Sequence, residues 1–488
     1  MNRLPIVSLA AGAFVSVAGA APPLVIYSEI PGDPTAQAPG LGLEFTSLLS
    51  LFASPNGQHW VFKGFVDDPE NDVIVVGFGM TGAVVAREAD PTSIDGTTHN
   101  FLDSDCGVND LGQYVYGSRL DGVASSADEI LFASGGVGGD LIAAREGNPA
   151  PDLIDIGLQG DETFGNSLNS PSRLVDGTVS FRADSINNID SSLESALYIG
   201  SAVAAQEGTV ATTGETFGGF TALSGNTFSV SPDGAHWIVE ADIDPSPLNS
   251  VESVVVDDSV VLQEGDLFGG TGLPIDGIFS VEMAPNNDWY ARGDFTDDTD
   301  WVVRNGALVA HTGGAVDATD FENWSAVISG VTGNINGDFL VTGETDNANT
   351  DINAVLVLNG ELMIAREGDG VDLNGNGIAD DGVEINSFSP EDIVLATDGT
   401  IYAFVTLRQT GGPGANLGDA FVRILPGPQP CNDADLAEPF GTLDFSDVVA
   451  FLTAFSAMEP AADLAEPTGT FDFSDVVAFL GAFGSGCP

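Results

Sequence analysis

The strand-and-turn phrase VVAREAD, at residues 84–90, recurs along most of the chain and decides its fold. Further copies are LIAAREGN (141–148), AVAAQEGT (202–209), SVVLQEGD (259–266), ALVAHTGG (307–314) and LMIAREGD (362–369). A second phrase, a glycine turn followed by an aromatic strand, alternates with it. Its copies are NGQHWVFKG (56–64), LGQYVYG (111–117), DGTVSFRA (176–183), DGAHWIVEA (233–241), NNDWYARG (286–293), NGDFLVTG (336–343) and DGTIYAFV (398–405). Self-similarity of this kind indicates a repeat architecture.

The spacing of the phrases gives the number of repeats. The segment LVIYSEIPGD (24–33) precedes the first aromatic strand and looks like a further copy of the strand-and-turn phrase, so that both phrases occur seven times. The charged turns are marked by Glu29, Glu88, Glu146, Glu207, Glu264, Thr312 and Glu367. Their mean spacing of about 56 residues lies in the range of blade-type repeats.

Each repeat contains four strand-like runs, which in the fourth repeat are Phe228–Val230, Trp237–Glu240, Ser253–Val256 and Val260–Gln263. Dipeptides such as Asp233-Gly234 and Asn305-Gly306 join neighbouring runs and favour the positive φ angles of tight hairpins. The pattern predicts a mainly β seven-bladed β-propeller, because radial closure protects the sheet edges. The N-terminal strand should complete the last blade. A β-solenoid or a pair of sandwiches is the alternative.

Two recurring polar features have a catalytic and a structural interpretation. Pairs such as Arg87-Glu88 and Arg366-Glu367 recur in most repeats, and a ring of carboxylates could perform acid–base chemistry. A residue that recurs in most repeats is better explained by a structural role, and we expect each Glu to form a hydrogen bond with backbone where one blade is followed by the next. His59 and His236 share a repeat position before Trp, which favours packing. The sequence contains no HExxH, GxSxG or phosphate-loop motif.

The charge is strongly negative, with 12 Lys plus Arg against 72 Asp plus Glu and a net charge of −60. Nucleic-acid binding is not expected, because phosphate contacts need clustered cations. The carboxylates are explained either by solubility in salty surroundings or by several calcium sites. Because most are scattered, we favour the first interpretation.

The first 20 residues have the features of a secretory signal peptide. Arg3 is followed by the apolar stretch Leu4–Val17 and by the small residues Ala18-Gly19-Ala20. The stretch is too short to span a membrane, and no later segment resembles a membrane helix. We therefore expect a secreted or cell-surface protein, without membrane insertion, with a repeat domain over residues 21–427 and a C-terminal module over 428–488.

A segment that breaks the repeat, DGVDLNGNGIADDGVE at residues 369–384, carries candidate calcium ligands. The candidates are Asp372, Asn374, Asn376, Asp380 and Asp381, and Gly377 permits the bend of a D-x-N-x-N-G loop. Val383 stands where an EF-hand has its last Glu, and the loop looks more like the short calcium loops of thrombospondin-type repeats. An acidic hairpin tip without metal is the alternative.

The C-terminal module contains two near-copies of one unit, ADLAEPFGTLDFSDVVAFLTAFSA (434–457) and ADLAEPTGTFDFSDVVAFLGAFGS (462–485). Apolar residues at helical spacing predict one helix in each unit, buried through Val448, Phe451, Leu452 and Phe455 and their copies Val476, Phe479, Leu480 and Phe483. Cys431 and Cys487 bracket the units and are expected to form a disulfide. Cys106, in the Asp/Gly-rich segment DSDCGVND, is expected to lie in a loop and to be a bystander rather than a nucleophile.

The tandem D-L-A-E-P-x-G-x-x-D-F-S-D-V-V-A-F-L phrase resembles dockerins, in particular dockerin-like C-terminal modules that end in or near Gly-Cys. The resemblance implies a calcium loop and a helix in each unit, and a cohesin domain on a scaffold or surface protein as partner. It assigns loop ligands to Asp435, Asp444 and Asp447 and to Asp463, Asp472 and Asp475, and partner contacts to Phe445, Ser446, Phe473 and Ser474. Ala437 and Ala465 replace an expected oxygen ligand, so that a metal-free helical hairpin is the alternative. The body also resembles exported propeller-like proteins with AREGD-type repeats.

Two functions follow from these patterns. The first is a non-enzymatic propeller, anchored through its C-terminal module. The second is a polysaccharide-acting hydrolase or lyase on the propeller face, carried by the same module. A central pocket with convergent carboxylates that break the repeat would favour the enzyme.

Overall fold

The computed structural model describes residues 21–136, 139–154, 160–220, 228–244, 251–268, 271–318, 321–411, 414–425, 434–437, 443, 445–457, 462, 464–465 and 471–486. Pro22–Ile424 form one compact unit, and the residues after Ile424 belong to a second. The predicted signal peptide, residues 1–20, lies outside the described residues, as do Cys431 and Cys487.

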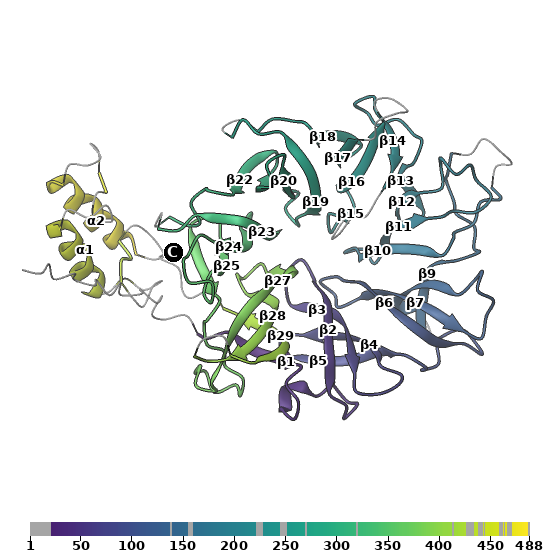
Figure 1. Cartoon of the computed structure of the whole chain (residues 1–488), viewed down its shortest axis with the longest axis horizontal. Helices are drawn as coiled ribbons and strands as arrows, with labels where there is room; N and C mark the ends of the chain where they lie inside the picture. Colours follow the sequence, from purple (N-terminus) through teal and green to yellow (C-terminus); the bar gives the residue numbers. More distant parts are fainter. Residues whose placement is uncertain are drawn as a thin grey trace, which may run out of the picture. The chain divides into compact units, whose positions relative to one another are not determined.

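The described part of the first unit contains seven antiparallel sheets, which are the blades of the predicted β-propeller (Figure 1). Blade 1 consists of β2 (Phe45–Ala53), β3 (His59–Val66), β4 (Asp72–Phe78) and β5 (Thr81–Arg87), and blade 2 of β6 (Thr98–Val108), β7 (Tyr114–Asp121), β8 (Glu129–Gly136) and β9 (Gly139–Arg145). Blade 3 consists of β10 (Ser167–Arg173), β11 (Val179–Asp184), β12 (Ala196–Ile199) and β13 (Ala202–Gln206). Blade 4 consists of β14 (Thr216–Gly219), β15 (Phe228–Val230), β16 (Trp237–Asp244), β17 (Val251–Val256) and β18 (Ser259–Gln263).

The remaining blades follow the same order. Blade 5 consists of β19 (Ile275–Met283), β20 (Trp289–Phe295), β21 (Asp300–Arg304) and β22 (Ala307–His311). Blade 6 consists of β23 (Trp324–Gly333), β24 (Phe339–Thr345), β25 (Ala354–Leu358) and β26 (Leu362–Arg366). Blade 7 combines β27 (Val383–Leu395), β28 (Ile401–Gln409) and β29 (Asn416–Ile424) with β1 (Leu24–Ser28). A short 3₁₀ helix, η1 (Pro34–Ala36), follows β1.

The predicted closure by the N-terminal strand is confirmed, because β1 pairs antiparallel with β29 as the outermost strand of blade 7. Tyr27 of β1 reaches into blade 1, with its ring centroid 5.9 Å from that of Trp60 and 5.6 Å from that of Phe45. Glu29, directly after β1, accepts a hydrogen bond of 2.8 Å from the backbone N–H of Leu48 in β2. The first and last parts of the propeller chain thus hold each other in place.

The glycine-turn phrase connects the first and second strands of each blade and joins neighbouring blades. Gly57 has φ +69°, and a Cβ at this position would overlap Ala396 of blade 7, so the close approach requires glycine. Successive turns are hydrogen-bonded sideways through Asn56 N–Asp110 Oδ1 (2.9 Å), Asn109 Nδ2–Leu174 O (2.8 Å), Val175 N–Pro232 O (2.9 Å), Asn334 Nδ2–Ala396 O (3.2 Å) and Thr397 Oγ1–Pro55 O (3.2 Å). The repeat therefore encodes contacts between blades.

The described part of the second unit contains two helices, α1 (Phe445–Ala457) and α2 (Phe473–Ser485). Phe451 of α1 stacks on Phe479 of α2, with ring centroids 4.2 Å apart and an interplanar angle of 14°. Asp472 caps α2 and forms a capping box with Asp475. A duplicated sequence thus gives two helices that bury the same positions against each other.

Three predictions need correction. Leu452 and Leu480, expected inside the helix pair, are 56% and 57% exposed, because the core is filled by the Phe and Val side chains beside them. Cys106, expected in a loop, lies in β6 opposite Tyr116 and is buried with a free thiol. Blade 4 has β14 in addition to the four strands expected.

Among the described residues, no helix combines the length and hydrophobicity that a membrane crossing requires.

Candidate functional site

The repeated Glu residues of the strand-and-turn phrase bind backbone within their own blades. Glu88 accepts a hydrogen bond of 2.9 Å from Asn71 N, Glu146 one of 3.2 Å from Asp128 N, and Glu367 one of 3.4 Å from Ala354 N. Each ties the end of its blade's outermost strand to the beginning of the third strand. The structural interpretation of this motif is supported, although these three bonds do not cross between blades.

Most of the blades are joined to the next blade by a hydrogen bond to a second carboxylate, which lies at or near the start of the third strand. It accepts a backbone N–H from the first strand of the next blade. The pairs are Asp72–Leu102 (2.9 Å), Glu129–Leu168 (3.1 Å), Glu252–Ile278 (3.1 Å) and Asp300–Ile328 (2.7 Å), and Glu29–Leu48 closes the ring. Burial raises the pKa of Glu129 to about 7 despite its bond to Leu168. These carboxylates are structural parts of the propeller.

The first strands of the blades surround a central cavity of about 190 Å³, to which all seven blades contribute. Figure 1 shows strands such as β10, β19 and β27 around the centre of the ring. Two acidic residues that break the repeat, Glu282 of β19 and Glu391 of β27, line this cavity. At the positions equivalent to Glu282, the other blades have Phe52, Gly107, Ser172, Ser229, Thr332 and Val394.

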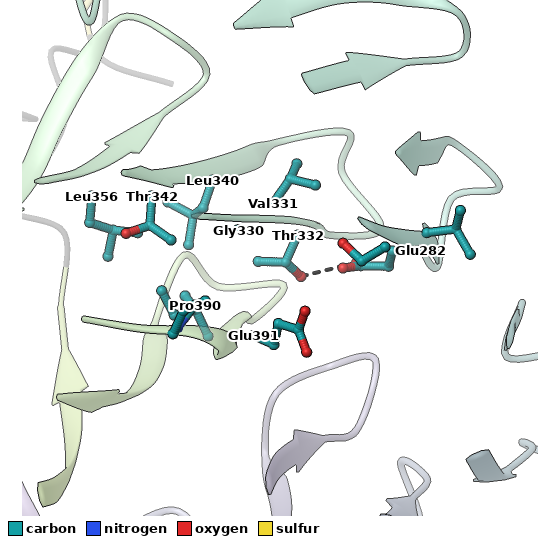
Figure 2. A pocket seen from close by; sticks show the side chains of 12 residues that line it. Glu282, Gly330, Val331, Thr332, Leu340, Thr342, Leu356, Pro390 and Glu391 are labelled. Atoms are coloured by element: carbon teal, nitrogen blue, oxygen red, sulfur yellow. Dashed lines mark hydrogen bonds between the residues drawn. The ribbon is translucent and has the colours of Figure 1, made fainter. Parts of the chain in front are cut away.

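A smaller cavity of about 30 Å³ lies beside the central one, between blades 5, 6 and 7 (Figure 2). Glu282 Oε1 accepts hydrogen bonds of 3.0 Å from both Thr332 Oγ1 and Gly333 N. Burial raises the pKa of Glu282 to about 7. Glu391 is instead paired with Arg292, with Oε1 2.9 Å from Nη2.

This arrangement is more suited to joining blades than to hydrolysis. Glu282 links blade 5 to blade 6 in the way that Ser229, one blade earlier, links blade 4 to blade 5 through Met283 N at 3.1 Å. The small cavity has room for one or two water molecules and not for a sugar ring. The small cavity is therefore too small for a sugar. In the larger central cavity, which both carboxylates also line, Glu282 is already bonded to blade 6 and Glu391 to Arg292.

The two histidines that share a repeat position have different surroundings. His59 packs on Phe78, with ring centroids 5.0 Å apart, as expected of a packing residue. The half-exposed His236 instead has Nδ1 2.6 Å from Asp257 Oδ2, and Asp257 also accepts a bond of 2.9 Å from Trp237 N. The two hydrogen bonds of Asp257 stabilise the turn between β15 and β16 together with the turn that follows β17.

The predicted calcium loop folds around Asp372, which is 3% exposed. Its Oδ1 accepts from Gly375 N at 2.8 Å and from Asn376 N at 3.0 Å, and its Oδ2 accepts from Gly377 N at 2.8 Å. Further side-chain bonds join Asn374 to Asp381, and Asn376 to Asp380 at 3.1 Å. Among the described residues, no three His, Cys, Asp or Glu side chains converge as a metal site would require. Calcium also binds amide oxygens, which Asn374 and Asn376 provide in this loop.

The same loop is attached to the strand that closes the ring. Asp372 N donates to Pro23 O at 2.9 Å, and Val25 N donates to Asp372 O at 3.0 Å. The base of the loop is held by Arg408, which is 3% exposed and bonds Glu384 at 2.8 Å and Glu367 at 2.7 Å. The sequence did not indicate that this loop would contact β1, because the two segments are more than 300 residues apart.

In the second unit, Asp447 and Asp475 are fully buried at equivalent positions. Asp447 Oδ1 accepts from Leu436 N and Ala437 N, both at 2.8 Å. Asp475 Oδ1 accepts from Leu464 N and Ala465 N, both at 2.9 Å. Each carboxylate holds its own Leu-Ala segment on its helix. Asp435 is buried and Asp472 is exposed, whereas Asp444 and Asp463 lie outside the described residues.

The outward faces of α1 and α2 carry matching apolar side chains. Phe445, Val449 and Leu452 of α1 are 77%, 49% and 56% exposed. Phe473, Val477 and Leu480 of α2 are 76%, 53% and 57% exposed. We call these two sets the α1 stripe and the α2 stripe. The predicted contact residues Ser446 and Ser474 are also exposed, next to the first Phe of each stripe.

Sequence reasoning identified the Phe residues of these stripes but missed Val449, Leu452, Val477 and Leu480. The spacing of 445, 449 and 452 was a usable signal, because residues four and seven apart share a helix face. With apolar residues on most sides of the helix, periodicity alone could not decide which face is inside.

Comparisons with known proteins add no family. No protein-family model matches the chain, and no curated protein sequence matches it. Among solved structures, the chain is similar to the Dos1 propeller, at 11% identity and a TM-score of 0.33 over 78% of this chain and 77% of that one. It is also similar to the β-propeller domain of the Trilobed protease from Pyrococcus furiosus, at 8% identity and a TM-score of 0.36 over 77% of this chain and 99% of that one. A puromycin hydrolase matches at 12% identity and a TM-score of 0.38, over 81% of this chain and 56% of the hydrolase. The fold assignment rests on the sheet order given above.

Proposed function

We propose that residues 428–488 are a dockerin-like docking module, which holds an exported, non-enzymatic propeller on a cohesin-like scaffold or surface protein. One observation carries this proposal: two duplicated helices expose the same three apolar positions to nearly the same extent. Scattered exposed apolar residues are normal, but an ordered apolar stripe on a helix is typical of an interaction surface.

The composition of the helix pair supports the same conclusion. The core of the unit already contains Phe451 and Phe479, each 1% exposed, together with the neighbouring Phe455 and Phe483. Phe445 and Phe473 are not part of that core. Exposure of an apolar side chain in water is unfavourable by about 1.5–3 kcal/mol relative to full burial. A stripe retained in both copies is therefore best explained by contact with another molecule.

The propeller has a supporting role in this proposal. Its recurrent carboxylates accept backbone hydrogen bonds within or between blades, as described above. A structural role explains why these carboxylates recur at fixed positions, without any catalytic activity. Polysaccharide binding at a propeller surface is compatible with anchoring. Glu282 and Glu391 both line the central cavity, and the hydrogen bonds and ion pair that they already make favour a structural role for them.

Calcium is proposed as a structural ion of the 372–381 loop. Asp372, Asn374 and Asn376 offer side-chain oxygens at alternate positions, and Asp380 follows four residues later, a spacing that calcium loops use. Because Asp372 is bonded to the segment around β1, an ion bound there would stabilise ring closure.

The docking proposal is tested with the full-length secreted protein immobilised as bait. We expect it to retain, from a surface extract of its own cells, a protein that contains a cohesin-like domain. The stripe variant Phe445→Ser, Leu452→Ser, Phe473→Ser, Leu480→Ser should lose that protein. A matched control, Ser485→Ala, changes an exposed polar residue of α2 to the alanine that α1 has at the equivalent position 457 and should retain it. Equal retention by all three baits, or retention of nothing with a cohesin-like domain, would reject the proposal.

A further inference from the structure

The duplication allows the two helix faces to be compared residue by residue. α1 and α2 are identical from Phe445 to Leu452 and from Phe473 to Leu480. They then differ on the outward side, where Thr453 and Ser456 of α1 correspond to Gly481 and Gly484 of α2. All four residues are exposed. The α2 stripe therefore continues into two glycines, and the α1 stripe continues into two side chains with hydroxyl groups.

The glycines of α2 have no explanation inside the module. A glycine within a helix is less favourable than alanine by about 1 kcal/mol. A Cβ added at Gly481 or Gly484 would have no described atom within 4 Å outside the local helix backbone, so space does not require glycine. In α1 the same positions hold Thr453, whose Oγ1 bonds Val449 O at 2.7 Å, and Ser456, whose Oγ bonds Thr453 O at 2.8 Å. Larger residues therefore fit this helix.

The two glycines lie on the same helix face as the α2 stripe. Residues 477, 481 and 484 are spaced by four and three, and Leu480 is adjacent. Glycine leaves the backbone uncovered, which permits a partner to approach closely. Phe473, Val477 and Leu480 thus lie beside a stretch of uncovered helix backbone at Gly481 and Gly484 of α2. On α1, Thr453 and Ser456 occupy the corresponding space.

The charge of the module constrains what can bind there. Residues 428–488 contain ten Asp or Glu and no Lys or Arg. The exposed side chains of the stripes are neutral, and the module as a whole is negatively charged. Of its described carboxylates, Asp472 is exposed directly before Phe473 of the α2 stripe, whereas Asp435, Asp447 and Asp475 are buried. Like charges placed opposite each other oppose binding, and complementary charges accelerate association. A partner must therefore combine apolar contact at the centre with positive charge at the edge.

We propose that the α2 stripe with Gly481 and Gly484 is the primary contact of the module, and that its partner is a protein surface with an apolar ridge flanked by Lys or Arg. This inference rests on the proposed docking function and adds the helix that is used and the chemistry of its partner. The apolar ridge of the partner packs on the backbone at Gly481 and Gly484. The side chains of Thr453 and Ser456 cover the equivalent backbone of α1, which makes α1 a poorer match for the same ridge.

The test exchanges the differing residues between the helices in the full-length protein. The probe is the protein identified by the capture experiment above, produced in recombinant form, and affinity is measured by titration calorimetry. Gly481→Thr plus Gly484→Ser gives α2 the α1 residues. We expect at least about a tenfold loss of affinity, although helix propensity favours the folded module. The reverse exchange, Thr453→Gly plus Ser456→Gly, should leave affinity within about twofold.

The possible outcomes separate the two proposals. If no protein depends on the stripes for capture, the docking function itself is rejected, and this inference with it. If a partner binds but the α2 exchange has no effect, or the α1 exchange weakens binding as much, the assignment to α2 is wrong. The association rate should also fall as NaCl is raised from 0.05 to 0.5 M, about a threefold change in Debye length. A rate independent of salt would overturn the positively charged edge.

Discussion

At the scale of single residues, Glu240 of β16 is the least compensated charged group in the described propeller. It is 1% exposed, and neither carboxylate oxygen has a hydrogen-bond partner. Burial, reinforced by the negative charges of Glu252 and Asp242, raises the pKa of Glu240 to about 8. Near neutral pH the folded protein therefore holds this carboxyl largely in its neutral form.

Glu240→Gln should stabilise the protein at pH 8 and have little effect at pH 5. In the unfolded chain the carboxyl ionises near its ordinary pKa of 4.5, well below the folded pKa of about 8. Stability is therefore lost as pH rises from about 5 to 8, by at most about 4 kcal/mol for this group. Urea unfolding of the parent and the variant at both pH values measures the difference. The exposed Glu361→Gln serves as control, and an equal gain at pH 5 and pH 8 would contradict the assignment.

Lys63, the only lysine in the sequence, joins blades 1 and 2 through a buried contact. It is 2% exposed, its Nζ lies 3.3 Å from Asp72 Oδ2, and it donates to Leu102 O. The same Nζ lies 4.1 Å from the ring centroid of Phe101.

Lys63→Met should destabilise the protein by about 3–5 kcal/mol, because it leaves the Asp72 carboxylate buried without its cation. The double variant Lys63→Met, Asp72→Asn should recover part of that loss, since no charge is then left unpaired. Chemical unfolding of the two single variants, the double variant and the parent gives the coupling energy. Additive losses in the double variant would show that the pair does not act as a unit.

The sequence could assign the role of some residues and not of others. A Glu repeated in most units indicated structure, and the hydrogen bonds of Glu88, Glu146 and Glu367 agree with that reading. The carboxylates that actually cross between most blades, such as Asp72 and Asp300, were missed. Their positions near the start of the third strand are held by Asp or Glu in several blades but lie outside the recurring phrases, so that repetition alone did not identify them.

At the scale of secondary-structure elements, β1 should control the stability of the whole ring. It provides the outer strand of blade 7, the Tyr27 contacts with blade 1, and the segment that binds Asp372. Deletion of residues 21–29 should lower the melting temperature by well over 5 °C, since several kcal/mol of contacts are removed. The control is Tyr27→Phe, which keeps the strand and the ring. A deletion variant that melts with the parent would reject closure by β1.

Calcium should act on the same element through the 372–381 loop. We expect millimolar calcium, compared with chelator, to raise the melting temperature of the full-length protein, because ligands that bind only the folded state stabilise it. Asp380→Asn removes an exposed carboxylate whose bond is to Asn376 and should reduce the calcium effect. Asp276→Asn, an exposed carboxylate of β19, should leave it unchanged. A melting temperature that is the same with calcium and with chelator would leave the loop as a metal-free turn.

Strands and helices were more accessible to prediction than their contacts. Alternation and Asn-Gly turns predicted hairpins such as β21–β22, where Asn305 and Gly306 both have positive φ. The helix pair was predicted from apolar spacing, but the side on which Leu452 and Leu480 lie was not. Which face of a helix is buried depends on which side chains of the two helices pack best into the shared core. Packing decides this, and the periodicity of apolar residues in the sequence does not.

At the scale of the whole molecule, a net charge of −60 opposes the compact state. The Debye length falls from about 8 Å at 0.15 M salt to about 3 Å at 1 M, so that repulsion between exposed carboxylates is largely screened in concentrated salt. Composition alone was sufficient for this conclusion. It could not show which carboxylates are buried, since that depends on neighbours from other blades.

Buried carboxyls add a second effect, which salt should not remove. Burial raises the pKa of Asp103 to about 6, of Glu129, Glu207 and Glu282 to about 7, and of Glu240 to about 8. Each folded-state value lies above the ordinary one near 4, so that the folded protein binds more protons than the unfolded chain between about pH 5 and 8. Stability should therefore fall as pH rises through this range.

The two effects separate in a grid of pH and salt. Raising NaCl from 0.15 to 1 M at pH 8 should raise the melting temperature, because exposed charges are screened. At 1 M NaCl the protein should still melt at a higher temperature at pH 5.5 than at pH 8, because groups inside the blades are little reached by salt. Glu240→Gln should reduce this remaining pH dependence, whereas the control Glu361→Gln should not. If the pH dependence vanishes at 1 M NaCl, repulsion at the surface accounts for all of it, and the buried carboxyls ionise without destabilising the propeller.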